Sequence, residues 1–349
     1  MREELKAIIH YLKEYDGPDM NIMEVCGSHT AAIAKNGIPT ILPDNVRLLS
    51  GPGCPVCVTP SSYIDRLIQL AMKEDTCVVT FGDLMRVPGS ETSLSAAKGA
   101  GARVAMVYSP MDILDMAARE KETTFIFAAV GFETTMPVYA LLVDTIVREK
   151  IPNIRLLTAL KTMPPVIDHL CRGGAAIDGF LAPGHVAVVT GADAFVPLAK
   201  RYSLPFGVSG FSGPELLVAI AGILKARGEG KVMNFYPSVV TRRGNERAKA
   251  MIDRYFDVCD ASWRGMGTVA GSGRILKKNF EWIDAGSRGL DEDRQKNKAC
   301  RCGEVLMGKI MPTECPLHGT VCTPLNPQGA CMVSTEGSCY SWYIHHRTK

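Results

Sequence analysis

Short apolar segments alternate with segments of helical periodicity through most of the chain, and this alternation narrows the possible folds more than any other feature. The apolar segments have the length and composition of β-strands. They are residues 21–25, 46–49, 76–81, 104–108, 124–130, 154–160, 178–182 and 205–208. Helices are predicted at 2–15, 30–35, 63–73, 93–98, 112–121, 137–150, 165–171, 192–202, 214–226 and 245–256. Such an alternation predicts parallel sheets joined by right-handed crossovers.

The order of these segments predicts an α/β fold with two similar, Rossmann-like parallel-sheet domains and a smaller cysteine-rich domain. The first domain is placed at 16–120, the second at 121–235 and the third at 236–349. Helix 1–15 is assigned to the third domain, because it precedes the first strand and has an apolar stripe to bury. Residues 263–275 are rich in glycine and are expected to wind irregularly. Whether each domain is a continuous stretch is left open.

Charge and hydropathy exclude some classes of partner. A net charge of +3 on 349 residues, without a basic stripe, gives no support for nucleic-acid binding. The longest apolar run, 216–224, is too short to cross a bilayer. Residues 1–15 are charged and amphipathic, which differs from a signal peptide. A cytoplasmic protein without a membrane partner is therefore expected.

The chain has twelve cysteines, unevenly distributed. In a reducing cytosol they favour metal binding or redox chemistry over a disulfide framework. One group, with a histidine nearby, lies among glycines and prolines: Cys26, His29, Cys54 and Cys57. A second group occupies the tail: Cys300, Cys302, Cys315, Cys322, Cys331 and Cys339. The others lie in apolar or helical surroundings and are expected to be packing residues: Cys77, Cys171 and Cys259.

The first group allows two chemistries. Cys54 and Cys57 form a C-x-x-C motif, whose spacing suits either a disulfide or a shared metal. Cys26 precedes His29 by three residues, and a neighbouring imidazole is expected to favour the thiolate. The sequence predicts a reactive site here and leaves redox exchange and metal binding both open.

The spacing in the tail favours an iron–sulfur cluster over zinc. Cys315, Cys322, Cys331 and Cys339 are separated by six, eight and seven residues. Zinc sites usually show two short knuckles, which this spacing lacks. Loops rich in proline and glycine can instead donate backbone N–H groups to cluster sulfurs.

Polar turns follow several predicted strands. Glu133 and His185 are expected at the ends of adjacent strands, where they could orient a ligand or relay protons. The turn 209–213 has a similar position, and all three can also be read as helix caps or tight turns. None is a P-loop or a GxGxxG turn, so a nucleotide site is not supported.

Five motifs together resemble the HypD family of [NiFe]-hydrogenase maturation factors. They are Glu-Val-Cys-Gly-Ser-His-Thr (24–30), Gly-Pro-Gly-Cys-Pro-Val-Cys-Val-Thr-Pro (51–60), Gly-Phe-Glu-Thr-Thr (131–135), Ala-Pro-Gly-His-Val (182–186) and Cys-Met-Val-Ser-Thr-Glu-Gly-Ser-Cys (331–339). The resemblance implies a cytoplasmic protein in which 236–349 carries a [4Fe–4S] cluster. It also implies a redox-active assembly scaffold rather than a turnover enzyme. Such scaffolds form a stable complex with HypC, receive cyanide transiently from HypE, and carry an iron with CN and CO ligands.

Residue roles follow from the resemblance. Cys26 would bind the iron, with His29 beside it, and Cys54 and Cys57 would be the redox pair. The cluster ligands would be Cys315, Cys322, Cys331 and Cys339, although Cys300 or Cys302 could replace one of them. His318 stands where an aromatic residue is expected. The alternatives are a cluster-dependent thiol–disulfide oxidoreductase and a zinc-stabilised interaction protein.

Overall fold

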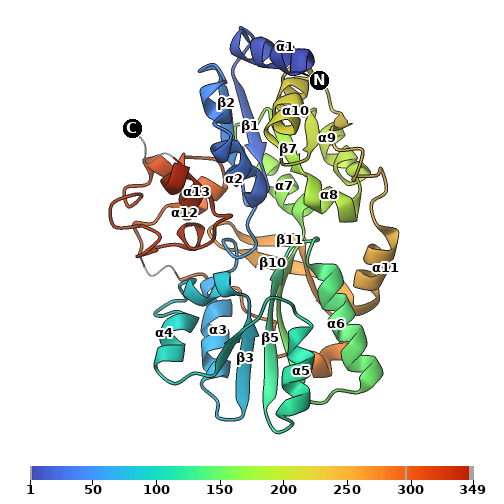
Figure 1. The fold of residues 1–349 in the computed structure, drawn as a ribbon, viewed down its shortest axis with the longest axis vertical. Coiled ribbons are helices and arrows are strands. Elements are labelled where there is room, and N and C mark those ends of the chain that lie inside the picture. The colour runs from blue at the N-terminus through green and yellow to red at the C-terminus, as the bar shows by residue number, and fades with distance from the viewer. Residues whose placement is uncertain (1, 295–296, 346–349) are drawn as a thin grey trace.

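Two sheets form two lobes of the molecule (Figure 1), and the computed structural model describes residues 2–294 and 297–345. The first sheet is entirely parallel, in the order β2 (Val46–Ser50), β1 (Met20–Glu24), β7 (Gly179–Pro183), β8 (Phe206–Ser209) and β9 (Val232–Asn234). The second has the order β10 (Phe256–Trp263), β11 (Gly267–Leu276), β6 (Ile154–Lys161), β5 (Thr124–Gly131), β3 (Thr76–Thr80) and β4 (Val104–Met106). The predicted α/β class with two mainly parallel sheets is confirmed.

Helices connect the strands and cover the sheets. The longer ones are α1 (Arg2–Lys13), α2 (Gly27–Lys35), α3 (Ser61–Ala71), α5 (Asp112–Arg119), α6 (Met136–Glu149), α7 (Met163–Arg172), α10 (Gly213–Lys225), α11 (Glu246–Tyr255) and α13 (Ser338–His345). The shorter ones are α4 (Leu94–Gly99), α8 (Gly184–Thr190), α9 (Val196–Tyr202) and α12 (Cys302–Leu306). Among the described helices, none has the length and apolarity needed to cross a membrane.

The central strand β5 shows why the sequence forms these sheets. All of its residues after Thr124 are buried, because helices cover the second sheet on both faces. Phe125 and Phe127 are essentially inaccessible to solvent. Each such side chain contributes roughly 1.5–3 kcal/mol when it leaves water. A continuous apolar run is the expected signature of a parallel strand buried on both faces.

The sheets do not follow the predicted domain boundaries. Residues 16–120 supply β1 and β2 to the first sheet but β3 and β4 to the second. Residues 121–235 are likewise divided, because β5 and β6 join the second sheet and β7 to β9 the first. The physical reason is that β1 pairs with β7 and β3 pairs with β5, and such long-range pairings leave no local mark in the sequence.

Two further segments differ from their predicted places. Helix α1 packs on α10, where Leu12 joins the apolar cluster of Leu216 and Ile220, rather than on the cysteine-rich tail. Residues 263–275, expected to wind, form most of a hairpin in which β10 pairs antiparallel with β11. Glycine permits the turn because Gly265 and Gly267 have positive φ angles of 74° and 77°. The hairpin extends the second sheet through pairing of β11 with β6.

The cysteine-rich tail lies beside α2 and between the two lobes (Figure 1). It contains α12, α13 and several short turns. One continuous cluster of buried apolar side chains joins both sheets to this tail, and it includes Val25, Ile126 and Cys331. The fold therefore brings residues from three distant parts of the chain to one place.

Candidate functional site

Cys26 lies where β1 leads into α2, and it caps the amino end of that helix. The backbone N–H groups of Ser28 and His29 favour charge on its sulfur. The second motif, residues 51–60, packs against the first, and the Gly27 N–H donates a hydrogen bond to the Gly53 carbonyl oxygen at 3.0 Å. The two cysteine motifs of the sequence are therefore in direct contact.

The Cys26 thiol is protonated at neutral pH. Burial raises its pKa to about 12, although the backbone N–H groups of His29 and Ser28 act in the opposite direction. The prediction that a neighbouring imidazole would favour the thiolate is therefore wrong, because removal from water outweighs the local dipoles. A metal ion that binds this sulfur must displace a proton.

His29 is completely buried beside Cys26. Its Nε2 lies 3.0 Å from the Gly210 carbonyl oxygen and 3.3 Å from that of Ser209. Because carbonyl oxygens only accept, Nε2 carries the proton. Burial lowers the pKa of His29 to about 4, so the ring is neutral. Within the described part of the chain its Nδ1 has no hydrogen-bond partner, and this lone pair can accept a proton or bind a metal.

His185 and the turn 209–213 form the wall next to His29. The Phe211 ring stacks on His185 with 3.9 Å between centroids and lies 4.7 Å from the His29 ring. A capping box fixes this turn, since the Ser212 hydroxyl accepts from the Glu215 N–H and the Glu215 carboxylate accepts from the Ser212 N–H. The turn is thus a helix cap that also positions an aromatic ring between two imidazoles.

Glu133 and His185 are not on adjacent strand ends, so this prediction is wrong. Glu133 follows β5 in the second sheet, whereas His185 follows β7 in the first. Glu133 Oε1 accepts the Met163 N–H at 2.8 Å, at the amino end of α7. Burial raises the pKa of Glu133 to about 7.

The raised pKa of Glu133 predicts a pH-dependent effect of Glu133→Gln. Its pKa rises from 4.5 to about 7 on folding, so the stability of the parent chain decreases as pH rises through this window. The amide cannot ionise, so we expect the variant to gain up to about 3 kcal/mol relative to the parent at about pH 8 and little at about pH 5. Urea unfolding at both pH values measures this difference, with the exposed Glu91→Gln as control. The same difference at both pH values would contradict the expectation.

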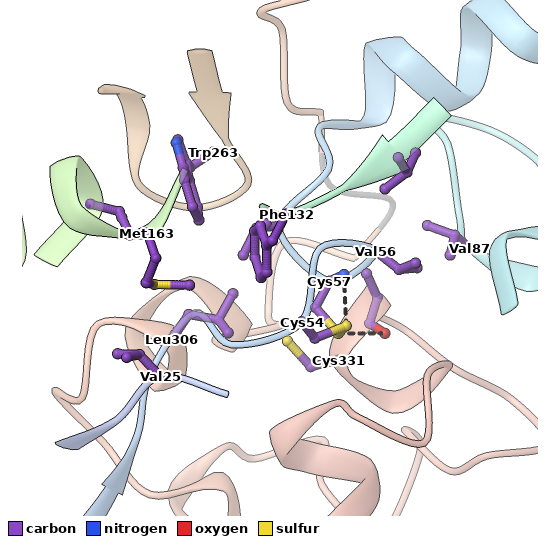
Figure 2. Close-up of a cluster of buried hydrophobic side chains, with 14 of the residues drawn as sticks. Val25, Cys54, Val56, Cys57, Val87, Phe132, Met163, Trp263, Leu306 and Cys331 are labelled. Carbon is purple, nitrogen blue, oxygen red and sulfur yellow. Dashed lines mark hydrogen bonds between the residues drawn. A yellow bond between two sulfur atoms is a disulfide. The ribbon is translucent and has the colours of Figure 1, made fainter. Parts of the chain in front are cut away.

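Cys54 and Cys57 form a disulfide with their Cα atoms 5.2 Å apart. Only 2% of Cys54 and 0% of Cys57 is exposed. Figure 2 shows Cys331 of the tail beside this pair, with Phe132 and other apolar side chains around it. The Cys57 sulfur also lies 3.8 Å from the Ala330 carbonyl oxygen. The C-x-x-C motif therefore lies against the tail and away from solvent.

The tail cysteines converge on one small, nearly filled cavity of about 10 Å³. The cavity is lined by Cys300, Cys302, Cys315, Cys322, Cys331 and Cys339, with His318, Gly329 and Met332. The Gln328 N–H points at the Cys322 sulfur at 3.4 Å. His318 Nε2 lies 3.1 Å from the Cys339 carbonyl oxygen. Thiols around a cavity, with a backbone N–H directed at sulfur, fit an iron–sulfur cluster.

The thiols line the wall of this cavity and do not converge on one position that a single metal ion could occupy. Among residues 2–294 and 297–345, no group of three or more His, Cys, Asp or Glu side chains forms a site for a single metal ion. Thiol hydrogen bonds instead join Cys300 to Cys302, Cys302 to Cys331, and Cys331 to Cys339. The ligands of a cluster surround a body several ångströms across, so a cluster would have to move these thiols apart, since the cavity now has room for about one water. The choice of four ligands among six stays a prediction.

Two carboxyl groups beside Cys26, buried Glu24 and half-buried Glu336, were not predicted from the sequence. Glu24 accepts the Cys26 N–H at 3.0 Å, and burial raises its pKa to about 8. Glu336 accepts from the Ser28 hydroxyl at 3.0 Å, and burial raises its pKa too. The sequence could have indicated Glu24 as a site residue, since it begins the first motif. It could not have indicated Glu336, because only the docking of the tail brings this residue beside Ser28.

The contact between the two motifs predicts that Gly53→Ala destabilises the protein. A Cβ at Gly53 would lie 2.4 Å from the Cys26 nitrogen, which is backbone and must shift. We expect a loss of about 1–3 kcal/mol in the free energy of unfolding, measured with urea under anaerobic conditions. Gly99→Ala is the control, because a Cβ there meets nothing within 4 Å. Equal stability of the two variants would contradict the close contact.

These features define a class of protein: a two-lobed α/β protein whose thiol-rich, buried site suits metal and electron handling. A family model described as "HypD: Hydrogenase formation hypA family" matches residues 2–346. The chain belongs to the HypD family of hydrogenase maturation factors, which confirms the resemblance seen in the motifs.

Similar proteins occur in bacteria and archaea. The chain is 41% identical to the hydrogenase maturation factor HypD of Escherichia coli, over 99% of this chain and 96% of that protein. It is 40% identical to HypD of Cupriavidus necator, over 95% of this chain and 91% of the relative. A putative hydrogenase expression/formation protein of Methanocaldococcus jannaschii is also 40% identical, over 94% and 92% respectively.

Proposed function

We propose that this chain is the redox-active scaffold on which the Fe(CN)2CO group of [NiFe]-hydrogenases is assembled, in the cytoplasm and in a stable complex with HypC. One observation carries the proposal: the three thiol centres are buried and contiguous. Gly53 contacts Cys26, the next residue Cys54 is bonded to Cys57, and Cys331 lies beside this pair while it also lines the cavity. Iron bound at Cys26 would therefore lie next to the disulfide motif through a backbone contact, and the disulfide lies next to the cluster cavity.

Cys26 would hold the iron under assembly. Iron(II) that carries cyanide and CO is a soft centre, which a thiolate suits. The free Nδ1 lone pair of neutral His29 would complete the binding site. Glu24, whose pKa is about 8 in the metal-free protein, and Glu336 would offset the positive charge of the metal once they are ionised. This arrangement explains why the thiol is held protonated until a cation replaces the proton.

The predicted cluster ligands are Cys315, Cys322, Cys331 and Cys339. A [4Fe–4S] cluster in this cavity would supply electrons one at a time. The Cys54–Cys57 pair handles two, because the dithiol releases two electrons and two protons when its disulfide forms. Cyanide transfer from a partner's S-cyano group consumes two electrons: the S–C bond breaks, the carbon binds iron as cyanide, and the sulfur leaves as a thiolate. HypE would be this transient donor, and the dithiol would supply the electrons.

The burial of the disulfide argues against a general thiol–disulfide oxidoreductase. An external thiolate must reach one sulfur in line with the S–S bond. Cys54 and Cys57 are 2% and 0% exposed, so a protein substrate has no access to them in this conformation.

The deciding experiment is an anaerobic infrared spectrum of the chain copurified with HypC. We expect bands of iron-bound cyanide and CO. The oxidoreductase alternative predicts no such bands, and disulfide reduction without HypC. Metal analysis of the same sample tests the zinc alternative, since the proposal expects about four irons with matching sulfide in the tail. Zinc in their place would overturn the redox role.

A further inference from the structure

A polar cavity adjoins Tyr63, the carboxyl end of β6 and the segment 287–291. It has a volume of about 320 Å³ and lies over the end of β6, where this strand pairs with β11 of the hairpin. The segment 287–291 closes it. Its charged lining residues are Lys161, Asp260, Arg274, Arg288 and Asp291. This volume is ample for a small molecule.

Lys161 is the unusual residue of this cavity. Its side chain is only 2% exposed, yet among the described residues no hydrogen bond or ion pair to its ammonium is present. Its ammonium instead faces the Trp263 ring, whose centroid is 5.8 Å from Nζ. That distance is near the limit for a cation–π contact. The cost of burying an unpaired cation is larger than such a contact returns.

The other charges in the wall select the ligand. Arg274 is already paired with Asp253 at 2.9 Å, so it adds little free positive charge. Asp260 and Asp291 lie at the exposed rim and repel multiply charged anions. Arg288 is exposed there and can guide a single negative charge inward. The balance favours a monoanion over phosphate.

We propose that this cavity binds a small carboxylate, whose oxygens accept hydrogen bonds from the Lys161 ammonium. The ligand supplies the direct partner that the protein does not give this ammonium, because Asp291 acts on Lys161 only from a distance. Burial lowers the pKa of Lys161 to about 8, which fits a cation that lacks a partner in the free protein. The site is separate from the thiol centres and does not depend on the maturation role.

Titration of the full-length, cluster-containing chain with sodium acetate, against sodium chloride of equal ionic strength, tests the proposal. We expect calorimetry to show saturable acetate binding, and Lys161→Met to weaken it at least about tenfold. Lys200→Met, at an exposed lysine of α9, should bind like the parent. Acetate heats equal to those of chloride, or unchanged binding by Lys161→Met, would overturn the proposal. Tighter binding of phosphate than of acetate would overturn the choice of a monoanion.

A second measurement needs no variant. Trinitrobenzenesulfonate labels accessible neutral amines, and labelling of each lysine can be followed by peptide mass spectrometry. We expect saturating acetate to slow the labelling of Lys161 and to leave Lys200 unchanged, whereas chloride slows neither. If acetate gives Lys161 no protection, the cavity does not bind carboxylates through this residue.

Discussion

Cys26→Ala is expected to abolish the infrared bands of iron-bound cyanide and CO in the copurified HypC complex. The side chain is the proposed protein ligand of the iron, and the alanine offers no atom to replace the sulfur. We expect the band intensity per chain to decrease more than about 100-fold, since removing even an outer partner of a metal ligand commonly costs about 10–100-fold in affinity. The cluster in the tail should remain, so iron content decreases only by the assembled iron.

Cys77→Ala is the matched control for this experiment. Cys77 is 7% exposed and Cys26 9%, and both are free thiols. Cys77 lies in β3 within an apolar cluster and away from the tail. Normal bands in Cys26→Ala would refute the assignment of the iron ligand. Loss of bands in both variants would point to misfolding instead, which circular dichroism of each variant would reveal.

Replacement of the cluster ligands is expected to have the second largest effect. Serine at Cys315, Cys322 or Cys339 should remove nearly all of the about four irons and the sulfide of the tail. Iron and sulfide analysis, together with the loss of the brown colour, measures this. Cys171→Ser is the control, because that free thiol lies in α7 outside the cavity.

Cys331 gives the sharpest version of this test. It is among the predicted ligands, but it also lies beside the disulfide and shares a thiol hydrogen bond with Cys302. The predicted set requires that Cys331→Ser loses iron while Cys300→Ser keeps it. The opposite result would show that Cys300 is the fourth ligand and that Cys331 belongs to the electron path between cavity and disulfide.

Strands β1 to β8 and most helices could be predicted because they depend on local patterns. The apolar run of β5 and the proline that begins α10 are visible in a few residues. The hairpin of β10 and β11 was not predicted, because a segment this rich in glycine is typical of irregular structure. The positive φ angles of its glycines in fact make the tight turn of the hairpin.

The candidate site was found as a set of residue types, and its chemistry was only partly predictable. Cys26, His29 and Cys54 occur in short motifs that tight turns and thiol chemistry explain. Their protonation was not predictable, because burial sets the pKa values of Cys26 and His29. The sequence also could not tell which sheet carries Glu133. Only the strand pairing shows that Glu133 and His185 follow strands of different sheets.

The α/β class, the family and the positions of the cysteine motifs can be read from the sequence alone, since all three depend on short-range patterns and on residue types. Only the tertiary structure decided that each sheet mixes strands from both halves of the chain, and that the tail docks between the lobes. It also placed Glu336 beside Ser28 and Cys331 beside the disulfide. The physical reason is that strand pairing and burial join residues hundreds of positions apart, and the free energy of such contacts is a property of the assembled core.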